Sequence, residues 1–99
     1  MASITPDTMI ARGDKHVETD VGDQTMMMSI HTGKYYALEG TARSIWTHLE
    51  QPLSVNALVD ALVEKFSVDK DTCMKDVMVF LEEMHENELV VEHKNEAGS

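Results

Sequence analysis

The residues that could serve as nucleophiles, bases or metal ligands are scattered along this chain. A catalytic nucleophile needs a base within reach, and a metal site needs ligands at suitable spacing. The single cysteine, Cys73, falls on an apolar helical stripe, where a buried thiol is the expected role. The five histidines form no HxxxH pair; they are His16, His31, His48, His85 and His93. The sequence therefore indicates neither an enzyme nor a cofactor or metal site.

The remaining polar residues also lack a catalytic arrangement. The acidic pair Glu82-Glu83 occupies adjacent helical positions that point in different directions, as on a solvated face. The five glycines occur singly at turns and ends, so the chain has no phosphate-binding loop.

Charge and composition exclude further classes of ligand. Eight Lys and Arg stand against 18 Asp and Glu, a net charge of −10 in 99 residues. Such a field repels nucleic acid and anionic lipid and attracts basic partners, although acidity also simply keeps a small protein soluble. No apolar run is long enough for a transmembrane helix. One cysteine allows no internal disulfide, which fits a reducing cytoplasm.

The elements that must position any site begin with a β-meander. Residues 16–38 alternate with a period of two, and Gly22-Asp23 and Thr32-Gly33 mark tight turns between three strands. The third strand is predicted at Lys34–Leu38. The simplest inner face of this antiparallel sheet consists of Met26, Met28, Ile30, Tyr36 and Leu38.

Three helices are predicted after Gly40, where the apolar period changes to that of a helix. The first has Thr41 as a possible cap and ends before Pro52. Ser54 and Asp69 are predicted to cap the second and third. Their apolar stripes contain Ala42, Ile45, Trp46 and Leu49; Val55, Leu58, Val59, Leu62 and Phe66; and Cys73, Val77, Phe80, Leu81 and Met84.

The predicted fold is therefore one small α+β domain, a three-stranded antiparallel sheet followed by three helices, similar to a winged helix-turn-helix. Leu89–Val91 can return as a short edge strand or an extended tail. Residues 9–92 form the domain, and residues 1–8 and 93–99 are expected to be flexible ends. A DNA-reading role fails on charge, because the third helix carries Lys70 and Lys75 against seven carboxylates between residues 69 and 88.

An extended peptide is the ligand that the remaining surface suits. The strand Lys34–Leu38 is the last of the meander, and a free edge is a template for strand addition. The third helix offers a second wall, because its apolar stripe is wide and includes Met74 and Met78, and methionine adapts well at binding surfaces. Core packing is the equally open alternative for both methionines. Tyr35 is either a peptide anchor or an ordinary exposed aromatic. The predicted peptide-binding residues are Lys34, Tyr35, Tyr36, Ala37, Leu38, Met74, Val77, Met78, Leu81 and His85.

The stretch from Lys34 to Val91 resembles the PqqD-like family, the RiPP recognition elements. The matching residues are Tyr35-Tyr36-Ala37-Leu38, Gly40-Thr41-Ala42 and Ile45-Trp46, then Ser54, Leu58, Ala61-Leu62 and Phe66, and finally Asp76-Val77, Phe80-Leu81, Met84 and Leu89-Val90. The resemblance implies a domain that binds the leader of a ribosomally made precursor peptide. It places the leader along the third strand, in the cleft beside the third helix.

Within that family, a stand-alone domain of this length most resembles the leader-binding subunit of lasso peptide pathways. The resemblance then implies two enzymatic partners, a cysteine protease that removes the leader and an ATP-dependent cyclase. Proteins of pyrroloquinoline quinone biosynthesis carry a segment resembling Tyr-Pro-Glu-Gly before the third strand, and residues 22–28 do not match it. The open alternatives are a carrier for a radical SAM enzyme, an acidic winged-helix regulator acting by protein contacts, and a homodimer formed through edge strands.

Overall fold

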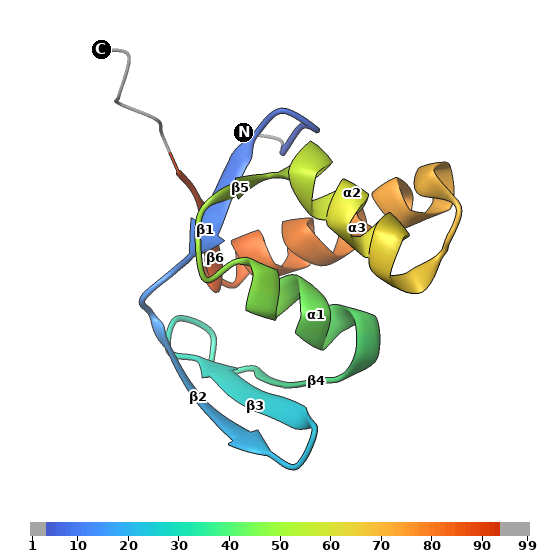
Figure 1. The fold of residues 1–99 in the computed structure, drawn as a ribbon. Coiled ribbons are helices and arrows are strands. Elements are labelled where there is room, and N and C mark those ends of the chain that lie inside the picture. Colours follow the sequence, from blue (N-terminus) through green and yellow to red (C-terminus); the bar gives the residue numbers. More distant parts are fainter. Residues whose placement is uncertain (1–3, 94–99) are drawn as a thin grey trace.

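The fold consists of two small sheets and three helices (Figure 1). The computed structural model describes residues 4–93. Along these residues run β1 (Met9–Arg12), β2 (His16–Val21), β3 (Gln24–Ser29), β4 (Tyr35–Leu38), α1 (Gly40–His48), β5 (Leu53–Ser54), α2 (Val55–Phe66), α3 (Lys70–Glu86) and β6 (Val90–Glu92). The predicted α+β class is confirmed. Figure 1 shows the meander on one side of α1 and the other two helices on the opposite side.

The meander has the order β2-β3-β4, and its strands are antiparallel as predicted. Of its predicted inner face, Tyr36 and Leu38 do lie on the core side, but the residues predicted on β3 are wrong by one position. Thr25, Met27 and Ser29 are buried, whereas Met26 and Met28 are half-buried on the opposite face and Ile30 is 61% exposed. Because side chains alternate strictly along a strand, a shift of one residue exchanges the two faces completely.

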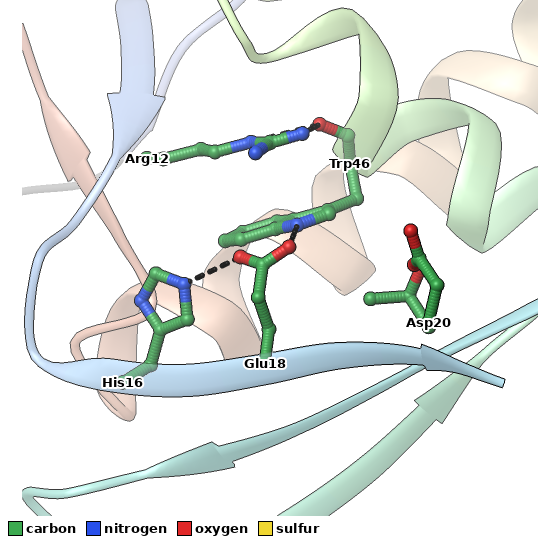
Figure 2. A network of polar contacts seen from close by, with 6 residues as sticks. Arg12, His16, Glu18, Asp20 and Trp46 are labelled. Carbon is green, nitrogen blue, oxygen red and sulfur yellow. Dashed lines mark hydrogen bonds and ion pairs between the residues drawn. The ribbon is translucent and has the colours of Figure 1, made fainter.

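The polar residues of β2 explain which face of the meander is turned toward the core, because their side chains point toward α1 (Figure 2). Glu18 accepts a hydrogen bond from Trp46 Nε1 at 3.3 Å and lies 2.8 Å from His16 Nε2. Asp20 accepts a hydrogen bond from the Thr25 hydroxyl at 2.8 Å, and Arg43 lies near its carboxylate. Glu18 and Asp20 thus have partners on the helix side of the sheet, although their side chains are 33% and 66% exposed, and the valines of β2 face outward.

A second sheet, β5-β1-β6, was absent from the prediction. Its centre is β1, whose Ile10 is fully buried and pairs with Leu53 on one side and Glu92 on the other. The return of Leu89–Val91 as a short strand is confirmed by β6. Gly13, the residue after β1, lies against the backbone that follows α3. A Cβ added at this position would lie 2.8 Å from the Glu88 carbonyl oxygen.

The chain before β1 packs onto the start of α2. Ile4 is buried in the core, and the carbonyls of Pro6 and Thr8 accept hydrogen bonds from the backbone N–H groups of Asn56 and Val55. Residues 1–8 were expected to be flexible, so this packing differs from that expectation for residues 4–8. Residues 1–3 and 94–99 of the expected flexible ends lie outside the described residues.

Two of the three predicted helix caps are confirmed. Ser54 accepts a hydrogen bond from the Ala57 N–H, and Asp69 accepts one from the Thr72 N–H. Glu39, rather than Thr41, precedes α1, and it makes no side-chain cap bond. The helices enclose the core around Trp46, Leu58, Leu62, Val77 and Leu81, and the predicted stripe of each helix supplies it, although Phe66 is 36% exposed. Within residues 4–93 no helix is long and apolar enough to cross a membrane.

Candidate peptide-binding site

Strand β4 has one paired edge and one free edge among the described residues. It pairs with β3 alone, with Met28 opposite Tyr35 and Met26 opposite Ala37. The Lys34 carbonyl accepts a hydrogen bond from the Ser29 N–H at 2.9 Å. Because backbone groups alternate along an antiparallel strand, the N–H and C=O groups of Tyr35 and Ala37 point away from β3. This edge can therefore pair with another extended chain.

The side chains of β4 divide between two faces of the sheet. Leu38 is buried in the core and Tyr36 is half-buried toward α3, while Tyr35 is 77% exposed on the opposite face beside Ala37. Lys34 is exposed just before the strand. The predicted strand residues thus lie together, with Tyr36 and Leu38 on the face toward the helices and Tyr35 and Ala37 on the face away from them.

A contact between Tyr36 and Glu83 fixes the flank of α3 that faces β4. The tyrosine hydroxyl donates a hydrogen bond to Glu83 Oε2 at 3.3 Å. Burial raises the pKa of Tyr36, and the charge of Glu83 and this hydrogen bond raise it further. The phenol is therefore neutral at ordinary pH and can hold the strand against the helix as a donor.

The α3 residues predicted to bind peptide do not lie on that flank. Val77 and Leu81 are buried in the core. At about 100° per residue, Met74, Met78 and His85 lie roughly 140–180° around the helix from Glu83. Both methionines are half-buried against the core, and His85 borders a hollow of mixed polarity with residues 13–15 and 90–91.

The flank that does face β4 carries Asp76, Phe80 and Glu83 instead. Val79 lies about 40° around the helix from Glu83, on the side away from the core, and is 63% exposed. The wide apolar stripe predicted for the third helix does include Phe80. The sequence could not show against which flank of that helix the sheet would pack. A wide apolar stripe has two flanks, and only the position of Tyr36 distinguishes them.

An apolar cavity of about 290 Å³ opens between the helices on this side. Its walls come from the start of α1, the end of α2 and the first half of α3; they include Ala42, Ile45, Leu62, Phe66, Cys73 and Phe80. Asp76 lies at the same cavity. Burial raises the pKa of the Cys73 thiol, and the charge of Asp76 adds to this effect. A protonated thiol suits an apolar wall and not a nucleophile.

The site thus combines a free strand edge, an apolar cavity and carboxylates. Free backbone groups give affinity for any extended chain, and side-chain pockets give selectivity. Asp76 and Glu83 favour Lys or Arg in the bound chain. Among the described residues, no three His, Cys, Asp or Glu side chains form a group that could hold a metal ion. The arrangement is that of a strand-and-helix peptide-binding module.

Comparison with known proteins places the chain within a family of such modules. Residues 24–90 match the family described as Coenzyme PQQ synthesis protein D (PqqD), and the chain belongs to that family. A solved structure described as TbiB1 in complex with the TbiA(beta) leader peptide is similar to this one, with a TM-score of 0.73 and 27% sequence identity. The match covers 86% of this chain and 99% of that chain. No curated protein sequence matches.

Proposed function

We propose that this domain binds the leader of a ribosomally made precursor peptide and presents it to modifying enzymes in lasso peptide biosynthesis. The observation that carries the proposal is the free edge of β4 beside α3, in a chain whose fold matches a protein solved with a leader peptide. The domain acts as a binding protein in the cytoplasm, where ribosomes make the precursor. Its partners are a leader peptidase and a cyclase, which supply the chemistry.

The leader adds to the free edge as a further strand. The N–H and C=O groups of Tyr35 and Ala37 pair with its backbone, and the cavity beside Phe80 and Cys73 accepts one of its apolar side chains. Each backbone hydrogen bond contributes about 0.5–1.5 kcal/mol, so the cavity anchor supplies a large part of the affinity.

Removal of one edge donor tests the strand addition. Ala37→Pro deletes an N–H that points away from β3, and proline is tolerated on an edge strand in that orientation. We expect a labelled leader peptide to bind roughly two- to ten-fold more weakly in fluorescence anisotropy, as the loss of one such hydrogen bond implies, with the thermal unfolding midpoint nearly unchanged. Ala37→Ser keeps the N–H and is the matched control. Equal affinity of both variants and the wild-type domain would rule out pairing at this edge.

Cys73 offers a second, independent readout of the cavity. The leader should slow the reaction of its thiol with an aromatic disulfide reagent, because a bound side chain covers that wall. Phe80→Asp should weaken leader binding, whereas Met78→Asp, on the other flank, should change it little. The reverse order would place the groove on the methionine side of α3.

A further inference from the structure

The β2-β3-β4 meander has two free edges among residues 4–93, since β2 and β4 each pair with β3 alone. Strand β2 is the longer of these two, with six residues against four. The Lys15 carbonyl, just before β2, accepts a hydrogen bond from the Ile30 N–H. Because backbone groups alternate along an antiparallel strand, the N–H and C=O groups of His16, Glu18 and Asp20 point away from β3. Backbone geometry alone therefore makes β2 at least as good a template for strand addition as β4.

The side chains on the inner face, the one turned toward α1, distinguish the two edges. On β4 they are Tyr36 and Leu38, which carry no charge and pack against the core. On β2 they include the carboxylates of Glu18 and Asp20, which keep part of their surface in water (Figure 2). A strand added to β2 places one of its side chains directly opposite Glu18 on this face, with the two Cβ atoms about 4.5–5.5 Å apart. Such a side chain takes water away from the carboxylate.

No class of side chain gains much from a position opposite these carboxylates. An apolar side chain removes water from a charge, and an acidic side chain repels that charge. A basic side chain finds both carboxylates already engaged: Glu18 accepts a hydrogen bond from Trp46 Nε1 at 3.3 Å, and Arg43 lies 3.8 Å from Asp20. A strand added to β2 thus loses in side-chain contacts part of what its backbone hydrogen bonds gain.

A second copy of this chain is disfavoured most strongly. The antiparallel register that uses every free backbone group of two β2 strands is centred on Glu18, so the Glu18 side chains of the two copies lie directly opposite each other. A register centred on Thr19 sets Glu18 against Asp20 twice. Like charges in directly opposite positions destabilise a strand pair, and inward-pointing charges are one of the ways in which natural sheets protect an edge.

These carboxylates reach the inner face because β2 is inverted. An antiparallel sheet with one solvated face normally turns its apolar side chains inward. On β2 the polar side chains face α1 and the valines face solvent. We infer that Glu18 and Asp20 determine which edge of the meander accepts a strand: they keep the β2 edge unpaired and direct the leader to β4. This inference rests on the proposed function only for the identity of the added strand, because a second copy of the chain also reports whether β2 can pair.

The experiment neutralises both carboxylates while keeping their acceptor oxygens. Glu18→Gln and Asp20→Asn can still accept the hydrogen bonds of Trp46 and Thr25. The full chain carries Ala37→Pro throughout, which weakens the β4 edge, and its self-association is followed by sedimentation velocity. We expect the neutral double variant to form dimers with a dissociation constant at least about ten-fold lower than that of the chain with both carboxylates. Equal dissociation constants would overturn the inference.

A proline variant shows whether the new dimers use the β2 edge. Asp20→Pro in place of Asp20→Asn also removes the charge, but it deletes an N–H that points away from β3, and an edge strand tolerates proline in that orientation. We expect this variant to dimerise no more tightly than the chain with both carboxylates, with an unchanged circular dichroism spectrum. Dimers that persist would place the pairing elsewhere and overturn the inference. If Glu18→Gln unfolds the domain, the single Asp20→Asn variant gives the same test with a smaller expected gain.

The leader peptide tests the choice of edge directly, in chains that keep Ala37. Isothermal titration calorimetry should give one leader per wild-type chain and a second, weaker leader on the neutral double variant. A second leader on the wild-type chain, or a single leader on the neutral variant, would overturn the inference. A leader that binds none of these chains would refute the proposed function alone, since self-association still reports whether the carboxylates keep β2 unpaired.

Discussion

Replacement of Trp46 by alanine should destabilise the whole domain. The indole is 2% exposed on α1 and fills the space between that helix and the meander. The Arg12 guanidinium lies 4.6 Å from the centroid of the ring, and the His16 ring is nearly perpendicular to it, with the two ring centroids 5.2 Å apart (Figure 2). Arg12 also donates two hydrogen bonds to the Trp46 carbonyl, at 2.7 and 3.1 Å, which survive the substitution.

The magnitude follows from the lost burial and the cavity. Truncation of a buried tryptophan or phenylalanine to alanine costs about 3–5 kcal/mol, and a domain of this size has about 5–15 kcal/mol in total. Trp46→Phe keeps an aromatic ring over most of the volume and loses the Nε1–H donated to Glu18. Because that carboxylate is 33% exposed, water can replace the donor, and we expect a loss of only about 1–2 kcal/mol.

Urea denaturation followed by circular dichroism measures both values. Trp46 is the only tryptophan in the chain, so its fluorescence cannot report on the variants. With an m-value of about 2 kcal/mol per molar, Trp46→Ala should lower the midpoint by roughly 2 M. A loss below about 1 kcal/mol, or a folded variant that fails only in leader binding, would refute the core assignment and place the indole in the binding surface.

Two further perturbations test the junctions around the site. Ser29 is fully buried, and its hydroxyl donates a hydrogen bond to the Asn87 carbonyl at 2.7 Å. Ser29→Ala leaves that carbonyl unsatisfied and should lower the free energy of unfolding by about 1–3 kcal/mol, measured by urea denaturation. A loss near zero would mean that the contact is dispensable. The pKa of Tyr36 is raised above its ordinary value of 10.0 by burial first and then by Glu83, so the unfolded chain releases this proton before the folded one. Its contribution is therefore complete below about pH 10 and is lost as the pH rises through the folded pKa. Tyr36→Phe should remove that part of the alkaline loss of stability, measured as the unfolding midpoint against pH, and an unchanged alkaline profile would contradict it.

The helices and their order could be predicted from the sequence because their signals are local. Ser54 and Asp69 cap helices whose apolar residues recur at helical spacing, and backbone geometry over a few residues fixes both features. The tight turn at Gly22 was equally predictable, since the residue adopts a φ of 63° that other side chains rarely accept. The free edge of β4 followed from the order of the meander.

Only the tertiary structure decided which faces these elements present. Strand β2 alternates polar and apolar residues, so either set can turn inward, and the choice depends on Trp46 and Arg43, which are distant in sequence. The flank of α3 beside the peptide edge depends likewise on the Tyr36–Glu83 contact. The second sheet is built from strands of two to four residues, too short for a periodic signal. The sequence by itself determined a peptide-binding class of fold, whereas long-range packing determined where the groove lies and which face of the meander is exposed.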